Sequence, residues 1–252
     1  MSTFWRESFI VFRRQLRMNL RNPAWVIIGA LQPVLYLLLF GPLLEPLVDQ
    51  FGVTNAYTFF VPGLLVQLGI FGAFFAGFSL IGEWREGVIE AERVTPASRT
   101  ALLVGRLIRD LLQLFVQALI LVVLGYIMGM DASFGGMVLG IALTLLIGGA
   151  CAAASNALAL TTKSEDVMAP VINMVMMPVL LLSGILLPMT IGPDWLQSAS
   201  DVMPIKHVVD AVRGSFMGDF AADTILWGTA WTVLLLGLAL WWGTRTFRKE
   251  NA

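Results

Sequence analysis

The sequence has few charged residues for its length. Asp, Glu, Lys and Arg make up 13% of its 252 residues, whereas soluble domains carry about 25%. Hydrophobic residues make up 58%, and the mean hydropathy is +0.81. The scarcity of charge excludes a soluble globular protein and indicates an integral membrane protein.

Cysteine and histidine occur once each, as Cys151 and His207. A single cysteine excludes a disulfide within the chain and a cysteine-based metal site. The sequence also lacks HExxH and the P-loop motif GxxxxGK followed by Ser or Thr. We therefore expect no enzyme, no catalytic residue, no metal site and no cofactor bound by this chain. A net charge of -1 gives no reason to expect nucleic acid as a partner.

Six apolar runs are long enough to cross about 30 Å of hydrocarbon as helices. They cover residues 24–44, 57–81, 111–130, 134–160, 167–188 and 224–243. The third begins earlier, near Thr100, and carries Arg106, Arg109 and Asp110 in its first turns. The sequence predicts an all-α integral membrane protein with a transmembrane domain over residues 24–243 and a tail over residues 244–252. Neutral polar residues in these spans, such as Ser155, favour interhelical hydrogen bonds over substrate binding.

Residues 1–23 predict an amphipathic helix on the membrane surface. Its arginines face the lipid headgroups, and its apolar side chains face the lipid. These apolar residues are Phe4, Trp5, Phe9, Phe12 and Leu16. A cleaved signal peptide and a frayed basic tail are the alternatives.

Positive charge is distributed unevenly between the loops. Fourteen of the sixteen Lys and Arg residues fall on one side of a six-span topology, and only Lys206 and Arg213 fall on the other. The positive-inside bias places both termini and the segment 83–99 in the cytoplasm.

One outer segment, residues 188–222, is too apolar for a free loop and too interrupted for a span. It predicts a re-entrant segment with two short helices, over about 194–201 and 204–217. A turn at Ser183 and Gly184 precedes them.

The segment 83–99, EWREGVIEAERVTPASR, contains four Glu and three Arg between two apolar runs. These seven charges exclude a location inside the bilayer. Trp84, Val88 and Ala91 recur at helical spacing, Pro96 ends the helix, and Ser98 or Thr100 caps the next span. A solvated loop without a partner is the alternative.

This segment, together with RNPAW at 21–25, FFVPGLL at 59–65, SGILLP at 183–188 and MPIKHVVDAVR at 203–213, resembles the permease subunits of ABC type-2 exporters. The resemblance is to the daunorubicin-exporter-like bacterial family and covers nearly the whole chain. It implies a bacterial inner-membrane, multi-pass permease that pairs with a second copy or a paralogous permease. It also implies two copies of an ABC ATPase subunit, which uses the ATP and Mg²⁺.

The same resemblance implies that the segment 83–99 forms a coupling helix seated in the ATPase. The candidate coupling residues are Glu83, Arg85, Glu86, Gly87, Glu90, Arg93, Pro96 and Arg99.

Substrate and gate are the remaining expectations. A path without fixed charges favours export of a lipophilic drug, a lipid or a glycolipid. Export of a polysaccharide, or a non-transporting role beside an ATPase, are the alternatives. The end of the fifth span predicts an extracellular gate, with a static cap as its alternative. The gate residues are Leu182, Ser183, Gly184, Ile185 and Pro188.

Overall fold

The computed structural model describes residues 2–21, 24–47, 55–93, 98–220 and 222–250. Within them the chain is helical and contains no strand. Six helices are long and apolar enough to cross a membrane, over residues 26–44, 56–85, 100–127, 134–162, 165–182 and 223–246. The predicted fold class and the six spans are therefore confirmed.

Six long helices carry these spans, and one of them continues as a shorter helix beyond a break. They are α2 (Ala24–Leu44), α4 (Ala56–Phe74) with α5 (Ala76–Arg85), α7 (Arg99–Ile127), α8 (Phe134–Thr162), α9 (Glu165–Leu182) and α12 (Ala222–Glu250). The other helices are α1 (Ser2–Arg21), η1 (Glu45–Leu47), α6 (Val88–Arg93), η2 (Met189–Ile191), α10 (Asp194–Asp201) and α11 (Pro204–Met217).

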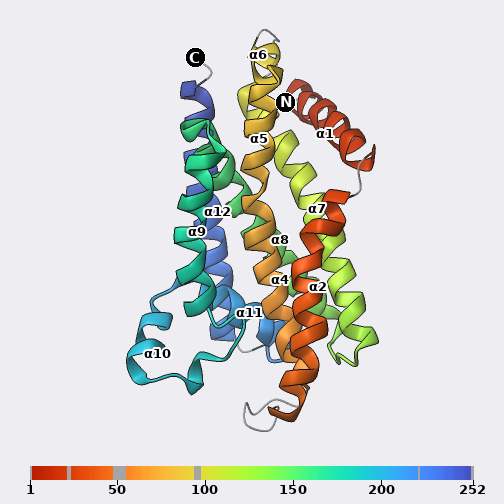
Figure 1. Ribbon diagram of the computed structural model, residues 1–252, viewed down its shortest axis with the longest axis vertical. Coiled ribbons are helices and arrows are strands. Elements are labelled where there is room, and N and C mark those ends of the chain that lie inside the picture. Colours follow the sequence, from red (N-terminus) through yellow and green to blue (C-terminus); the bar gives the residue numbers. More distant parts are fainter. Residues whose placement is uncertain (1, 22–23, 48–54, 94–97, 221, 251–252) are drawn as a thin grey trace.

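The helices form a bundle with two distinct ends (Figure 1). One end, called here the α6 end, carries α6, α1 and the C-terminal part of α12. The opposite end, the α11 end, carries α10 and α11. Helix α1 lies across the α6 end at an angle to the spans.

Helix α8 lies at the centre and packs against α4, α5, α7, α11 and α12. Its small residues Ala152, Ala153 and Ala157 are buried and allow this close packing. By contrast, only 11% of the α9 span, 17% of the α12 span and 22% of the α2 span is buried. These three helices leave most of their span residues outside the core, as expected for contact with lipid or a second protein.

Side chains cap three of the long helices. The carboxamide of Asn55 accepts hydrogen bonds from the amides of Tyr57 and Thr58, at 2.8 and 3.2 Å. The hydroxyl of Ser98 accepts one from Ala101, as Ser133 does from Gly136. The prediction of Ser98 as a cap of the third span is confirmed, and such caps define where each helix begins.

Three boundaries differ from the sequence-based expectation. The fifth span ends at Leu182, because Gly184 adopts a left-handed φ of 72° that ends the helix. The second span breaks at Phe75 and continues to Arg85. The last helix continues without interruption through the predicted tail as far as Glu250. Helices are present over both of the short segments where they were predicted, 194–201 and 204–217.

Candidate functional site

The charged segment at the α6 end forms an elbow rather than one helix. Helix α5 ends at Arg85, and Gly87 adopts a φ of 74°, which a residue with a side chain rarely adopts. Helix α6 then begins at Val88. The expected single stripe of Trp84, Val88 and Ala91 on one helix is therefore wrong, because the turn at Gly87 separates Trp84 from the other two.

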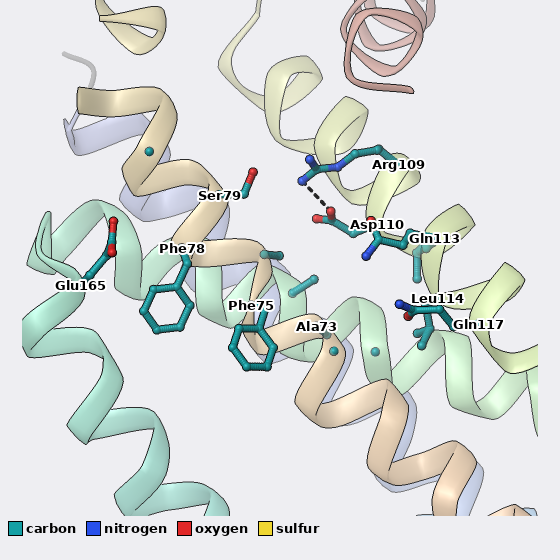
Figure 2. A pocket seen from close by; sticks show the side chains of 16 residues that line it. Ala73, Phe75, Phe78, Ser79, Arg109, Asp110, Gln113, Leu114, Gln117 and Glu165 are labelled. Carbon is teal, nitrogen blue, oxygen red and sulfur yellow. Dashed lines mark ion pairs between the residues drawn. The ribbon is translucent and has the colours of Figure 1, made fainter. Parts of the chain in front are cut away.

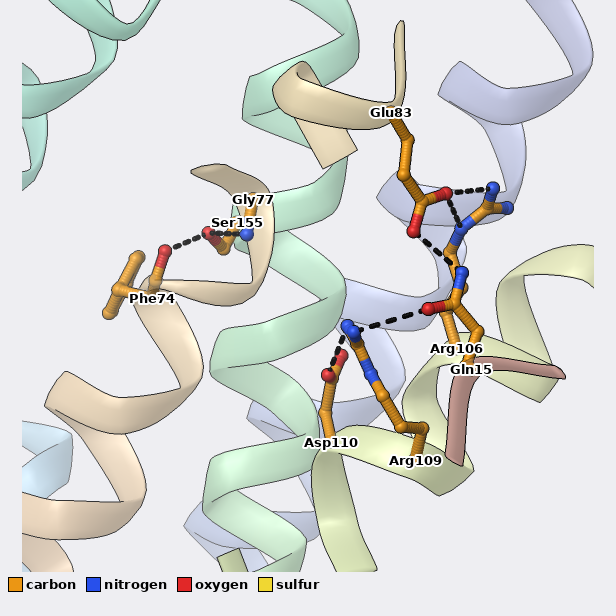
Figure 3. Close-up of polar contacts among 8 residues, drawn as sticks. All are labelled: Gln15, Phe74, Gly77, Glu83, Arg106, Arg109, Asp110 and Ser155. Atoms are coloured by element: carbon orange, nitrogen blue, oxygen red, sulfur yellow. Dashed lines mark hydrogen bonds and ion pairs between the residues drawn. The ribbon is translucent and has the colours of Figure 1, made fainter. Parts of the chain in front are cut away.

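The side chain of Glu83 lies inside the protein, with 7% of its surface exposed. Its carboxylate accepts a hydrogen bond of 2.6 Å from the Nε2 of Gln15 and one of 2.7 Å from the Nη2 of Arg106 (Figure 3). The Nε of Arg106 donates a third, at 3.3 Å. The carboxylate of Glu83, a predicted coupling residue, is therefore bound within the chain by α1 and α7.

Arg109 and Asp110 extend the same polar cluster toward the membrane interior. The Nη2 of Arg109 lies 2.6 Å from Oδ1 of Asp110, and its Nη1 donates to Oε1 of Gln15 at 3.4 Å. The cluster therefore holds two carboxylates and two guanidinium groups, whose charges cancel. We call it the buried charge cluster and define it as Gln15, Glu83, Arg106, Arg109 and Asp110.

The buried charge cluster determines how α1 is placed. Helix α1 packs on α7 with Ser8, Val11 and Gln15 buried, while Trp5 and Phe9 are exposed. A Cβ atom at Gly105 of α7 would lie 2.7 Å from the carbonyl oxygen of Ser8. The exposed aromatic residues agree with the predicted amphipathic helix, but the polar Gln15 faces the protein because Glu83 and Arg109 bind it.

A second polar contact fixes the break between α4 and α5. The hydroxyl of Ser155 on α8 donates to the carbonyl oxygen of Phe74 at 2.5 Å and accepts from the amide of Gly77 at 3.1 Å. These two backbone groups lie where the helix is interrupted and lack some of their helical partners. Ser155 therefore joins helices, as predicted, and attaches the start of α5, the helix that leads to the elbow, to α8 (Figure 3).

The outer surface of the elbow carries Arg85 and Glu86, both exposed. Arg85 forms an ion pair of 3.0 Å with Glu165, at the start of α9. Two other predicted coupling residues, Glu90 and Arg93, lie in α6, and Arg99 begins α7, but the described side chains do not include these three. Pro96 lies outside the described residues.

At the α11 end, the turn after α9 is held by Arg213. Its Nη2 donates to the carbonyl oxygen of Gly184 at 3.0 Å, and its Nε donates to that of Phe59 at 3.2 Å. The guanidinium carbon lies 3.8 Å from the centre of the Phe59 ring. Burial lowers the pKa of Arg213 to about 10, so the side chain stays charged at neutral pH.

The predicted gate residues lie around this turn. Ser183, Gly184 and Ile185 are buried, while Leu182 and Pro188 are half-buried. The hydroxyl of Ser200 also donates to the carbonyl oxygen of Leu182 at 2.6 Å. The turn is therefore attached to α4, α10 and α11 in this structure.

Sequence reasoning missed the buried charge cluster and the Arg213 contacts. The available signal was the spacing of Arg106, Arg109 and Asp110, which puts three charges on one face of an apolar helix. Such charges require partners within the protein. Among the described residues no group of three His, Cys, Asp or Glu side chains could hold a metal ion.

The described residues form six apolar helices, with a charged elbow at the α6 end and a turn held by Arg213 at the α11 end. These features define a multi-pass membrane protein of the transporter type. The model of the ABC-2 type transporter family matches residues 6–217. The chain therefore belongs to the ABC-2 type transporter family, whose members are membrane permeases that work with ABC ATPase partners.

Three relatives illustrate the range of the family. The chain is 27% identical to the putative transport permease ycf38 of Cyanophora paradoxa over 216 residues, covering 83% of this chain and 74% of the relative. It is 28% identical to the daunorubicin resistance ABC transporter permease protein DrrB1 of Streptomyces coeruleorubidus, covering 76% and 68%. It is 26% identical to the probable multidrug ABC transporter permease YbhR of Escherichia coli, covering 71% of this chain and 48% of YbhR.

Proposed function

We propose that this chain is the permease subunit of an ATP-driven exporter that moves a lipophilic drug, a lipid or a glycolipid out of the cell. Two copies of an ABC ATPase subunit bind it and use the ATP and Mg²⁺. A second permease, either another copy or a paralogue, completes the pathway. Family membership and the names of relatives in drug resistance support this proposal.

The elbow between α5 and α6 is the observation that carries the proposal. Its exposed outer surface, with Arg85 and Glu86, is available to a partner, while its inner side is joined to α1 and α7 by Glu83. Separating the buried Glu83–Arg106 pair is costly, so a force on α6 moves α5 and α7 together rather than bending the elbow alone, and Gln15 hydrogen-bonds α1 to both. A coupling element needs both an exposed surface that contacts the ATPase and a rigid attachment to the membrane-spanning helices.

We also propose that the chain lies in the bacterial inner membrane with both termini in the cytoplasm. The distribution of Lys and Arg supports this orientation. In a Cys151→Ser background, a cysteine at Asp131 should react with an impermeant reagent in intact cells, and one at Ser98 should not. Labelling of the Ser98 position from outside would overturn the orientation.

The turn at the α11 end is the proposed extracellular gate. Gly184 interrupts the helix, and the buried side chain of Ile185 occupies the space beneath the turn. Opening would require the Arg213 contacts to the Gly184 and Phe59 carbonyl oxygens to break. The static cap is the alternative, and it predicts that weakening these contacts leaves export unchanged.

The permease and its ATPase, reconstituted together, test the coupling role. An Arg85→Glu, Glu86→Lys double variant should lose ATPase binding in a pull-down and lose ATP-dependent uptake of daunorubicin into inverted vesicles. Removing one member of a desolvated charge pair at an interface costs about 2–5 kcal/mol, enough to dissociate or uncouple a complex. Asp223→Lys, an exposed charge reversal at the α11 end, is the matched control and should behave like the wild type.

Two results would decide against the proposal. Wild-type binding and uptake by the double variant would show that the elbow does not contact the ATPase. Normal ATPase binding without ATP-dependent movement of daunorubicin, a fluorescent phospholipid or a glycolipid would favour a non-transporting partner.

A further inference from the structure

A cavity of about 550 Å³ lies between α5 and α7 (Figure 2). Helices α5 and α7 both pack on α8. Residues of α8 and of the end of α4 form the back of the cavity. One side of the wall is polar and comes from α7, with Arg109, Asp110 and Gln117. The α4–α5 side is largely apolar and includes Phe75 and Phe78. Volumes of this size are typical of sites for small amphiphilic molecules.

Two polar atoms of residues that line the cavity lack hydrogen-bond partners among the residues that the structure describes. They are Oδ2 of Asp110, an acceptor, and Nε of Arg109, a donor, and both are buried. The other ends of the same side chains are paired with each other, and Arg109 is also paired with Gln15. In Figure 2 the Asp110 carboxylate points from α7 toward α5. Buried polar groups normally have partners, so this pair of atoms indicates a bound group that supplies one donor and one acceptor.

The charges around the cavity restrict the chemistry of that group. Glu83, Arg106, Arg109 and Asp110 cancel in charge, and Glu165 on the far wall is paired with Arg85. An isolated anion or cation would therefore leave an unbalanced charge in a region of low dielectric constant. A zwitterion with a hydrogen-bonding ammonium group and an anionic oxygen keeps the balance and satisfies both atoms.

The depth of the cavity favours a lipid as the source of the zwitterion. Asp110 lies 17 residues from Ile127 at the other end of α7, which corresponds to about 25 Å along a helix. The hydrocarbon layer is about 30 Å thick, so Asp110 lies just inside its boundary at the α6 end. Lipid headgroups lie at this boundary. The exposed ring of Phe75 continues the apolar wall of the cavity toward the membrane.

We propose that this cavity binds a zwitterionic phospholipid with a primary ammonium group, of the phosphatidylethanolamine type, from the leaflet at the α6 end. The ammonium group donates to Oδ2 of Asp110, and a phosphate oxygen accepts from the Nε–H of Arg109. The glycerol and the first acyl carbons lie against Phe75 and Phe78. This inference does not depend on the chain acting as an exporter.

Native mass spectrometry of the delipidated full-length permease tests the proposal with defined probes. Dioctanoyl phosphatidylethanolamine should bind one per chain, and about tenfold more tightly than dioctanoyl phosphatidylcholine, whose quaternary ammonium cannot donate a hydrogen bond to Asp110. Dioctanoyl phosphatidylglycerol, which lacks the ammonium group, should be equally weak. Glycerophosphoethanolamine, which lacks acyl chains, should bind at least tenfold more weakly than the lipid.

Two variants and a matched control localise the binding. Gly82 of α5 lines the cavity and a Cβ atom there meets no atom within 4 Å, so Gly82→Leu adds a side chain at the cavity and should reduce binding at least tenfold. Gly237→Leu on α12 also meets no atom within 4 Å and is the matched control, which should bind as the wild type does. Asp110→Asn should reduce the preference for phosphatidylethanolamine over phosphatidylcholine to below about threefold.

Three outcomes would overturn the proposal. Equal affinity of the wild type for the three lipids would remove the role of the ammonium group. Unchanged binding in Gly82→Leu would place the lipid elsewhere. Equal binding of glycerophosphoethanolamine and the lipid would identify a soluble zwitterion as the ligand.

Discussion

Replacing Glu83 with Gln perturbs a buried carboxylate of α5 that contacts both α1 and α7. The change keeps the shape of the side chain but removes its charge, so Arg106 loses its 2.7 Å ion pair while its own side chain stays 2% exposed. Removing one member of a buried pair typically costs about 3–5 kcal/mol. We therefore expect Glu83→Gln to lower the unfolding midpoint by on the order of 10 °C.

Thermal unfolding of the purified permease in detergent, followed by tryptophan fluorescence, measures this effect. Glu86→Gln is the matched control: it makes the same chemical change three residues away on an exposed side chain, and its effect should stay within about 0.5 kcal/mol. Equal midpoints for Glu83→Gln and Glu86→Gln would refute the reasoning.

A double-variant cycle separates the ion pair from other effects. Glu83→Gln with Arg106→Met removes both members of the ion pair, so the double variant should be more stable than the sum of the two single changes predicts. Strict additivity would show that the two side chains do not stabilise each other.

Three further predictions concern the elbow, the outer turn and the pairing of permeases. Gly87→Val should reduce the transport-stimulated ATP hydrolysis of the partner ATPase more than Gly87→Asn does. Asn tolerates a positive φ, whereas a β-branched residue such as Val does not. Equal effects of the two substitutions would contradict a role for the left-handed turn. In Arg213→Lys, the single ammonium group cannot replace the two guanidinium hydrogen bonds to the Gly184 and Phe59 carbonyl oxygens. Residues 183–188 should therefore exchange amide hydrogen faster. Unchanged exchange would show that the Arg213 contacts do not hold the turn. Leu35 and Met177 are both exposed, and cysteines placed near them in a Cys151→Ser background should crosslink between protomers. A variant that still transports but runs as an uncrosslinked monomer on denaturing gels would contradict pairing through α2 and α9.

The number of spans and the outer helices could be predicted from the sequence, because the bilayer imposes a simple constraint. A polar backbone in hydrocarbon must form a helix, so long apolar runs identify spans without tertiary information. Helix α11 was predictable for a local reason, since Pro204 suits the first turn of a helix. These features depend on residues that are neighbours in the sequence.

The buried charge cluster could not be predicted in this way. Glu83 lies in a run of charged residues, and nothing in the run distinguishes it from the exposed Glu86. Its partner Gln15 lies 68 residues earlier, on a helix whose pattern suggested only lipid contact. The same is true at the α11 end, where Arg213 and Phe59 are 154 residues apart. Contacts at such separations depend on how the helices pack.

The relative strength of the contacts indicates where the bundle can move. Helices α5 and α7 share a buried ion pair, and Gln15 of α1 hydrogen-bonds to both of them, so separating α5 from α7 would expose charge at a cost of several kcal/mol. Helix α9 is different: at the α6 end it is joined to α5 through the Arg85–Glu165 pair, whose side chains are 54% and 42% exposed, and an exposed pair contributes only about 0–1 kcal/mol. Only 11% of its span is buried. We therefore expect a force applied at α6 to move α1, α5 and α7 as one unit relative to α9. That displacement would act on the turn after Leu182, where α9 meets the Arg213 contacts.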